Sequence, residues 1–158
     1  MMSKEIERKY LVKGNQWKNL AEGVVYRQGY IATVGKPTVR VRVFGNQGYL
    51  TIKGESIGIV RSEFEYPIPL EDAEEMLKTL CDRPLIEKIR YKIPYGNLLW
   101  EVDEFLGENA GLIIAEVELA SEDQKITLPE WIDKQVSDPK YFNSNLAKHP
   151  YNQWLDKY

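Results

Sequence analysis

Charged side chains recur at alternate positions along several short segments of this 158-residue chain. Side chains two residues apart on a β-strand point to the same side, so each segment would have one charged face. Carboxylates bind hard divalent cations, whereas lysine and arginine bind phosphate oxygens. The acids are Glu5, Glu7, Glu63, Glu65, Glu101, Asp103, Glu116 and Glu118, and the bases are Lys9, Arg40, Arg42, Lys53, Arg61, Lys88, Arg90 and Lys92. This combination suits a site that binds metal ions and phosphates.

Eight segments with a two-residue hydrophobic period predict eight β-strands, and the charged positions above fall on them. The strands are expected at residues 4–12, 24–33, 38–44, 48–54, 60–68, 85–93, 98–105 and 112–120. Short turns at 45–48 and 95–97 contain glycine and asparagine, which tolerate positive φ, and they predict hairpins. Residues 107–111 separate the last two strands.

Four helical segments are expected between and after the strands. Within residues 70–81, apolar residues recur three and four positions apart, which predicts a helix with one apolar face. That face consists of Ala73, Met76, Leu77, Leu80 and Cys81. A short helix is expected within 15–22, and another over 129–136, which opens with a proline, a residue favoured at the first helical position. A last helix is predicted to begin near Asn143 or Ser144, either of which would cap it.

The predicted fold is mainly β (α+β): a closed eight-stranded antiparallel β-barrel with a charged interior and a few helices packed outside. Closure removes exposed sheet edges. The apolar face of the helix at 70–81 needs a partner, so we expect apolar strand faces to point outward and charged faces inward. A dry interior would cost several kcal/mol per buried ion, so the lumen must be hydrated and hold ions or a charged ligand.

Two other arrangements stay open at this point. An antiparallel sheet often has one face in solvent, and the charged positions would then be ordinary surface residues. A barrel for apolar ligands, of the lipocalin kind, predicts the opposite orientation of every charged pair.

The ordered series of charged pairs resembles the CYTH superfamily, the triphosphate tunnel metalloenzymes. The ExExK opening of that family is matched by residues 5–9, EIERK. The likeness continues in RVR (40–42), TIKG (51–54), EFE (63–65), EKIRY (87–91), EVDEF (101–105), AEVEL (115–119) and VSDPKYFNSNLA (136–147). It covers nearly the whole chain, so one domain is expected over residues 1–158.

The resemblance implies an eight-stranded tunnel that binds a triphosphate together with a divalent cation. An all-carboxylate site favours Mg²⁺ or Mn²⁺ over zinc. Short bacterial members of the family are most like inorganic triphosphatases, which form pyrophosphate and phosphate. The chain is therefore expected to be a metal-dependent hydrolase that acts on phosphoanhydride bonds.

The acids are expected to hold the metal. The first and last strands would adjoin in a closed barrel, so their acids are the expected metal ligands. These are Glu5, Glu7, Glu116 and Glu118. The other acids would complete a second metal site, hold ligands in place, or form salt bridges with bases inside the tunnel. They are Glu63, Glu65, Glu101 and Asp103.

The bases are expected to hold the phosphate oxygens, arginine through paired hydrogen bonds and lysine as a point charge. The substrate-binding set is Lys9, Arg40, Arg42, Lys53, Arg61 and Arg90, with Lys88 beside them. A water in line with the terminal phosphorus would attack, and positioning and charge neutralisation would supply most of the catalysis. Tyr30 falls where short bacterial members of the resembled family carry a tyrosine proposed as proton acceptor. Lys88 falls where relatives have a lysine thought to position the water.

Composition narrows the other possibilities. Twenty-one basic and 24 acidic residues give a net charge of −3, so no basic excess favours nucleic acid or a membrane surface. A single cysteine, Cys81, rules out an intrachain disulfide, and a single histidine, His149, disfavours histidine-based metal sites and triads. No apolar run approaches the roughly 18 residues of a membrane-spanning helix. We expect a cytoplasmic monomer or homodimer whose partner is a small triphosphate.

Other functions stay open from the sequence alone. A class IV adenylate cyclase would release cyclic AMP and pyrophosphate, and a thiamine or nucleoside triphosphatase would use the same site on a larger substrate. A non-catalytic binder of polyphosphate or nucleotides would bind without turnover. The chain has no GxxxxGK[ST] loop, so a P-loop nucleotidase is not supported.

Overall fold

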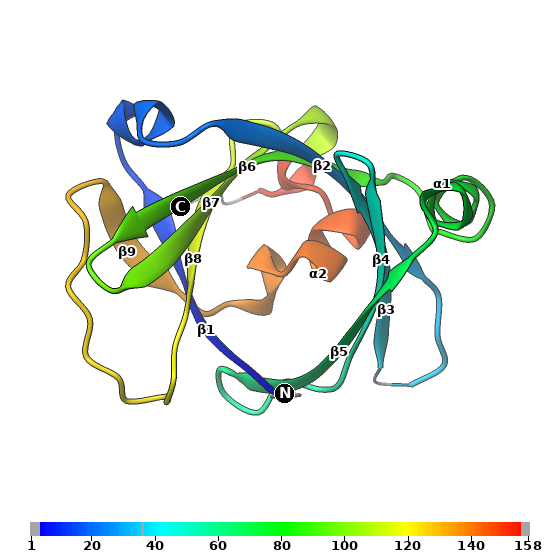
Figure 1. The fold of residues 1–158 in the computed structure, drawn as a ribbon, viewed down its shortest axis with the longest axis horizontal. Helices are drawn as coiled ribbons and strands as arrows, with labels where there is room; N and C mark the ends of the chain where they lie inside the picture. Colours follow the sequence, from blue (N-terminus) through cyan, green and yellow to red (C-terminus); the bar gives the residue numbers. More distant parts are fainter. Residues whose placement is uncertain (1–3, 36, 156–158) are drawn as a thin grey trace.

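Eight strands close into a barrel in the computed structural model, which describes residues 4–35 and 37–155 (Figure 1). The strands are β1 (Lys4–Val12), β2 (Gly23–Ile31), β3 (Thr38–Phe44), β4 (Gln47–Lys53), β5 (Val60–Ile68), β6 (Ile86–Tyr95), β7 (Leu98–Phe105) and β8 (Ile113–Glu118). Neighbours in the order β5-β4-β3-β2-β6-β7-β8-β1 pair antiparallel. β1 also pairs with β5, which closes the ring and confirms the predicted barrel.

The helix α1 (Leu70–Thr79) covers one outer side of the barrel, where a helix was predicted. Its buried Ala73 and Leu77 pack against Val41 and Val43 of β3. The arginines of β3 alternate with these valines, so they face the lumen. The predicted orientation, with apolar faces outward beneath a helix and charged faces inward, is confirmed on this side.

A second apolar cluster covers the outside of β1, β7 and β8. Trp17 lies in η1 (Gln16–Asn19), a 3₁₀-helix within the segment predicted as a short helix. It belongs to one buried cluster with Trp100 of β7 and Trp131 of the segment that follows β8. The strand residues of this cluster alternate with lumen-facing acids, so the same orientation holds here.

A third apolar cluster lies inside the barrel and closes one end. We call it the apolar plug, and it consists of Tyr30, Ile86, Phe105, Leu112, Ile114, Tyr141, Leu146, Ala147 and Trp154. Its members in β6, β7 and β8 occupy the lumen-facing parity of those strands, two positions beyond a charged residue. Tyr30 comes from β2 and Leu112 directly precedes β8. The remaining members come from the C-terminal segment, which contains η3 (Pro139–Tyr141), α2 (Asn143–Lys148) and η4 (Tyr151–Gln153).

The apolar plug corrects the expectation that all apolar strand faces look away from the lumen. Figure 1 shows α2 lying across the ring of strands. The C-terminal segment excludes water from this end of the lumen, and unpaired charges there would lack hydration. Apolar side chains therefore replace charged ones on the same inward strand faces.

Residues 129–136 do not form the predicted helix, so that prediction is wrong. The chain forms β9 (Ile132–Val136) instead and pairs antiparallel with β1. β1 contacts β5 only over residues 4–6, so the rest of that edge is available for hydrogen bonding to β9. This pairing, together with burial of Trp131 and Ile132, outweighs the local preference for a helix after a proline.

The last helix, α2, begins at Asn143 as predicted, but the expected cap is wrong. Phe142 is the N-cap residue and no side chain caps the helix. The side chain of Asn143 accepts a hydrogen bond from Lys88 of β6 instead. Across residues 4–35 and 37–155, the structure has no helix with the length and apolar character needed to span a membrane.

Candidate active site

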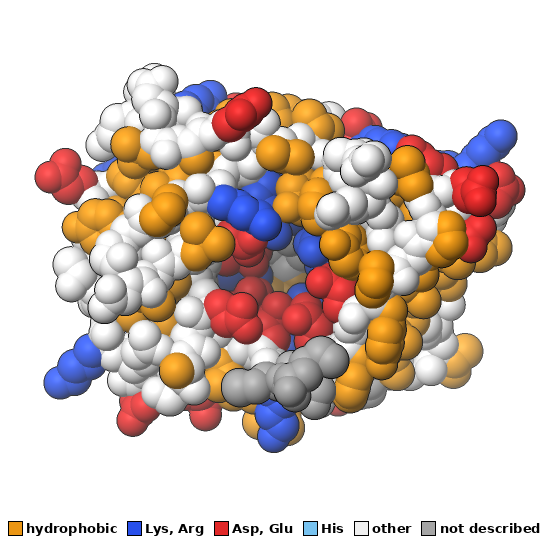
Figure 2. Space-filling model, in the orientation of Figure 1, with side chains coloured by type: hydrophobic (Ala, Val, Ile, Leu, Met, Phe, Trp, Pro, Cys, Tyr) orange, Lys and Arg blue, Asp and Glu red, His pale blue; other side chains and the backbone are white. Residues whose placement is uncertain are grey.

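The open part of the lumen holds a cavity of about 590 Å³. Figure 2 shows acidic and basic side chains gathered inside the hollow. The predicted site residues that line it are Glu5, Glu7, Lys9, Tyr30, Arg40, Arg42, Lys53, Arg61, Glu63, Glu65, Lys88, Arg90, Glu101, Glu116 and Glu118. Asp103 does not line the cavity because it is fully buried behind it. The barrel thus brings side chains from all eight of its strands and more than 100 residues of sequence to one site.

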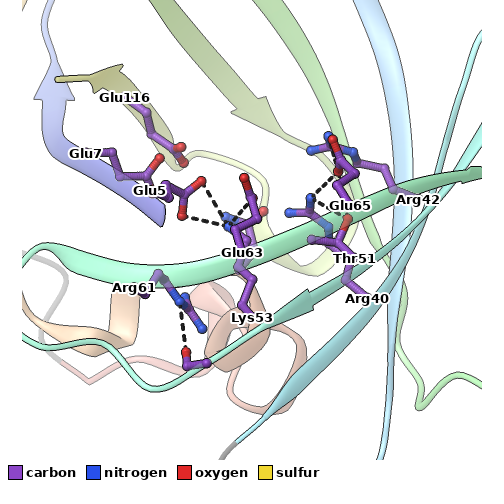
Figure 3. Close-up of polar contacts among 12 residues, drawn as sticks. Glu5, Glu7, Arg40, Arg42, Thr51, Lys53, Arg61, Glu63, Glu65 and Glu116 are labelled. Carbon is purple, nitrogen blue, oxygen red and sulfur yellow. Dashed lines mark hydrogen bonds and ion pairs between the residues drawn. The ribbon is translucent and has the colours of Figure 1, made fainter. Parts of the chain in front are cut away.

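One wall of the cavity is acidic and is formed by β1, β5, β7 and β8. Two lysines form ion pairs with four of its carboxylates. Lys9 Nζ lies 2.8 Å from Glu7 Oε1 and 3.1 Å from Glu116 Oε1. Lys53 Nζ lies 3.0 Å from Glu5 Oε1 and 3.4 Å from Glu63 Oε2 (Figure 3). Glu63 is one of the four acids for which salt bridges with bases were the alternative, and it forms one here.

The acidic wall holds more negative charge than these lysines balance. Burial and the nearby Glu116 carboxylate raise the pKa of Glu7 to about 7. Burial and the Glu5 carboxylate raise the pKa of Glu63, and burial with Glu5 and Glu101 raises that of Glu118. A cation bound at this wall would offset the burial and the repulsion that raise these three pKa values.

The opposite wall is basic and is formed mainly by β3 and β6. Arg40 and Arg42 both approach Glu65 Oε1, at 3.3 and 3.4 Å, and Thr51 donates to the same oxygen at 2.7 Å. Figure 3 shows these four side chains converging from β3, β4 and β5. Burial, followed by repulsion from Arg40 and Arg90, lowers the pKa of Arg42 to about 10. The charge of Arg42 is therefore compensated only in part, and a polyanion bound at this wall would compensate it further.

Tyr26 holds two of these guanidinium groups in place. Its ring centroid lies 5.3 Å from the Cζ of Arg42 and 5.0 Å from the Cζ of Arg90. It also stacks on Phe44, with the ring centroids 4.4 Å apart. An aromatic face between two cations reduces the freedom of both and sets their direction.

The floor of the cavity, next to the apolar plug, contains its most buried charges. Asp103 accepts two hydrogen bonds from Arg90, from Nε at 2.7 Å and Nη2 at 2.8 Å. Lys88 Nζ lies 2.8 Å from Asp103 Oδ2. Burial would raise the pKa of Asp103, but Arg90 and Lys88 hold it below its usual value. Burial lowers the pKa of Lys88 to about 7. The Asp103 carboxylate raises this pKa and offsets burial only in part, whereas the positive charge of Arg90 lowers it further.

Tyr30 lies at the same floor but faces the plug as well as the cavity. Its hydroxyl accepts a hydrogen bond of 2.9 Å from Gln28 Nε2. Gln28 also donates to Asn143 Oδ1, at 3.3 Å, and Lys88 donates to that oxygen at 2.9 Å. The two residues expected to handle the proton, Tyr30 and Lys88, are thus connected through two amide side chains.

Sequence reasoning missed Tyr26, Gln28, Thr51 and Asn143. Tyr26 and Gln28 share the strand face of Tyr30, and Thr51 shares that of Lys53, so alternation would have found these three. Asn143 gave no such signal because it reaches Lys88 from a helix 55 residues away in sequence.

The chemistry of the acidic wall fits a divalent cation. Its donors are all carboxylate oxygens, which Mg²⁺ and Mn²⁺ prefer. A cation bound beside Glu7 would offset the burial and the repulsion from Glu116 that raise the pKa of this carboxyl. Within the described part of the chain, no three acidic, histidine or cysteine side chains converge on one point, because Lys9 and Lys53 separate the carboxylates.

Three comparisons relate the chain to known proteins. The model of the CYTH domain family matches residues 3–150. The chain is 54% identical to the inorganic triphosphatase of Acetivibrio thermocellus over 156 residues, which covers 98% of this chain and 100% of that protein. It is 38% identical to the inorganic triphosphatase of Nitrosomonas europaea over 152 residues, covering 90% of this chain and 96% of that one.

Solved structures agree with these sequence matches. The crystal structure of the inorganic triphosphatase NE1496 aligns with a TM-score of 0.62 and 34% identity, and covers 90% of this chain and 93% of that one. The putative adenylyl cyclase HpAC1 from Hippeastrum aligns with a TM-score of 0.60 over 74% of this chain and 80% of that one. At 14% identity, the second likeness shows the fold alone.

Proposed function

We propose a function from the premise that this chain belongs to the CYTH domain family, whose model matches residues 3–150. The proposed reaction is hydrolysis of inorganic triphosphate to pyrophosphate and phosphate, assisted by Mg²⁺ or Mn²⁺. One observation carries the proposal: a single closed-end cavity has a crowded basic wall facing an acidic wall. The two curated relatives, which carry the name inorganic triphosphatase, support the same substrate class.

The basic wall binds the phosphate chain. Arg42 and Arg90 are oriented by Tyr26 and lie where a polyanion relieves their mutual repulsion. The full binding set is Lys9, Arg40, Arg42, Lys53, Arg61 and Arg90. Glu65 and Asp103 hold arginines in place in this proposal, because Glu65 Oε1 and both carboxylate oxygens of Asp103 already contact them.

The acidic wall holds the divalent cation, with Glu5, Glu7, Glu116 and Glu118 as its ligands. Glu63 and Glu101, which line the same cavity, complete the set if a second cation binds. The cation supplies positive charge to the phosphoryl oxygens and makes the terminal phosphorus more electrophilic. Glu7, whose pKa is about 7 without a cation, would be held in its ionised form near neutral pH when a cation is bound.

Lys88 is the residue that positions the attacking water in this proposal. It lies at the floor of the cavity, is 1% exposed, and is already fixed by Asp103. The water oxygen bonds to the terminal phosphorus as the bond from that phosphorus to the bridging oxygen breaks, which releases phosphate and pyrophosphate. The proton that the water loses passes to Tyr30 in this proposal, and the Tyr30 hydroxyl lies on the same hydrogen-bonded chain.

The test is an assay of the purified protein with inorganic triphosphate, ATP, thiamine triphosphate and pyrophosphate. Each is incubated with Mg²⁺, Mn²⁺ or EDTA, and products are identified by ion chromatography. We expect turnover of inorganic triphosphate that requires a divalent cation. Cyclic AMP formed from ATP would favour the cyclase alternative, and metal-dependent binding without products would overturn the enzymatic proposal.

A matched pair of variants locates the reaction in the lumen. Arg42→Ala is expected to reduce kcat/KM about 100-fold, because the lost guanidinium is one of the preorganised groups facing the phosphates. Arg27→Ala removes an arginine from the outside of β2, where it pairs with Glu74 of α1, and should leave kcat/KM unchanged. Equal losses in both variants would place the reaction outside the cavity.

A further inference from the structure

Asn143 occupies the point where the C-terminal segment meets the floor of the cavity. Its Oδ1 accepts hydrogen bonds from Lys88 Nζ at 2.9 Å and from Gln28 Nε2 at 3.3 Å. These contacts span 55 and 115 residues of sequence, and both partners belong to the strands of the barrel. Asn143 also lines the cavity, so its carbonyl group is part of the site as well as of α2.

The contact with Asn143 restricts the orientation of the Lys88 amino group. An ammonium group carries three donor hydrogens in tetrahedral directions. One is directed to Asp103 Oδ2 at 2.8 Å and a second to Asn143 Oδ1 at 2.9 Å. With two acceptors fixed, rotation about the last bond of the lysine is blocked, and the third direction is left for a group in the cavity that Lys88 lines.

Packing of the C-terminal segment determines where Asn143 lies. One turn further along α2, Leu146 is fully buried in the apolar plug together with Tyr141 and Trp154. On the other side, the ring of Phe142 lies 5.7 Å from Lys9 Nζ and 5.9 Å from the Cζ of Arg61. The start of α2 is therefore held both by the plug and by two bases of the site.

We propose that Asn143 is a positioning residue, whose side-chain oxygen turns the Lys88 amino group toward the phosphate end of the cavity. Docking of α2 then completes the catalytic floor, in addition to sealing the barrel. The inference rests on the proposed triphosphatase reaction. It adds to that reaction a requirement for a residue outside the strands.

The proposal predicts a loss in kcat with little change in KM. Binding of the phosphate chain relies on the basic wall, which Asn143 does not contact, whereas the direction of Lys88 matters at the reacting phosphorus. Misplacement of one such group by about 1 Å costs on the order of 100-fold in rate. Asn143→Leu, which keeps the volume but removes the acceptor, is therefore expected to reduce kcat about 100-fold and to change KM for triphosphate less than about threefold.

Two further substitutions at the same position separate positioning from packing. Asn143→Asp keeps the shape and the acceptor oxygen, so kcat should return to within about threefold of the unmodified protein, with KM raised by the added negative charge. Asn143→Ala avoids any clash in the plug and should show the same loss in kcat as Asn143→Leu. All rates are expressed per folded protein, measured by near-ultraviolet circular dichroism.

Asn145→Ala is the control for general damage to α2. Asn145 lies on the same helix, donates to the Pro139 carbonyl and makes no hydrogen bond to Lys88 in the described structure. This variant should retain the kcat of the unmodified protein. If it loses as much activity as Asn143→Leu, or if Asn143→Leu and Asn143→Ala retain full kcat, Asn143 has no positioning role. An unmodified protein without triphosphate turnover overturns the proposed function itself, which separates the two failures.

Discussion

The two ends of the barrel lumen are built from the same strands and differ in chemistry. Four strands change from charged to apolar within two residues along the inward face. The changes are from Lys9 to Leu11 in β1, from Lys88 to Ile86 in β6, from Asp103 to Phe105 in β7 and from Glu116 to Ile114 in β8. The two-residue period of a strand determines which residues face inward. Whether those residues are charged depends on what they face, which is the hydrated cavity at one end and the C-terminal segment at the other.

Charged side chains are most buried at the boundary between the two ends, where an ionised group costs the most free energy. Lys88 and Asp103 are at most 1% exposed, whereas acids nearer the mouth, such as Glu101, are 29% exposed. At the mouth, water and a bound ligand compensate the charges. At the boundary only fixed partners do so, which are Arg90 and Asn143. The boundary therefore combines a catalytic position with a stability risk.

Removing the charge of Asp103 tests the boundary and should have the largest effect. Asp103→Asn leaves Arg90 and Lys88 buried without a counter-charge, and breaking a buried ion pair costs about 3–5 kcal/mol. The free energy of unfolding, measured by urea denaturation at pH 7, should fall by that amount. Glu101→Gln, on the same face of β7 but nearer the mouth, should change it by less than about 1 kcal/mol. Similar losses in the two variants would remove the distinction between boundary and mouth.

The apolar plug should respond to loss of volume. Leu146 is fully buried there, and Leu146→Ala deletes three carbon atoms from a packed cluster. We expect the free energy of unfolding to fall by about 3 kcal/mol, from lost burial and the cavity left behind. Leu80→Ala, at an exposed position after α1, should cost less than about 0.5 kcal/mol. A loss below about 1 kcal/mol for Leu146→Ala would mean that the plug does not hold the end closed.

The open end could be predicted from sequence and the closed end could not. Alternation of Glu5, Glu7 and Lys9 is local, so it fixes their common face before any fold is known. The inward position of Ile86 or Phe105 follows the same alternation. The apolar character of these residues, however, is explained only by packing against a segment that lies some 40 to 60 residues later in the sequence. The expectation that apolar faces look outward failed for this reason.

Two other failures have the same physical origin. The residues at 129–136 carry a local helix signal, but the edge of β1 that they hydrogen-bond to is distant in sequence. Asn143 fits a capping pattern, but its side chain bonds to Lys88 on β6. In each case a long-range hydrogen bond outweighs a local preference of about 1 kcal/mol.

A substitution at the mouth should change stability in the opposite direction from those at the boundary and the plug. The pKa of Glu7 is raised to about 7, from 4.5, by burial and by Glu116. Between these values the unfolded chain releases its proton first, so this group lowers stability as pH rises through the window. Glu7→Gln should therefore raise the free energy of unfolding at pH 8 by about 2 kcal/mol relative to its effect at pH 4.5, while triphosphate turnover is lost.

Glu5 supplies the matched control for this prediction. Burial alone would raise its pKa, but Lys53 holds it below the usual value. Its ionised form stabilises the fold above the unfolded pKa, so Glu5→Gln should lower the free energy of unfolding at pH 8. Urea denaturation of both variants at pH 4.5 and pH 8 gives the comparison. If the effect of Glu7→Gln on the free energy of unfolding is no more favourable at pH 8 than at pH 4.5, the carboxylate of Glu7 is not destabilising in the folded barrel.

The smallest effect is expected outside the barrel, where an ion pair has the same bond lengths as the one at the boundary. Arg27 Nη2 lies 2.8 and 2.7 Å from the two carboxylate oxygens of Glu74, and Arg90 contacts Asp103 at 2.7 and 2.8 Å. The side chains of the outer pair are 36% and 45% exposed, so water solvates both charges when the pair is broken and the pair adds little to stability. Glu74→Gln should change the free energy of unfolding by less than about 0.5 kcal/mol in urea denaturation, against about 3–5 kcal/mol for Asp103→Asn. Equal costs would mean that bond geometry, and not exclusion of water by the plug, determines what a charge contributes in this barrel.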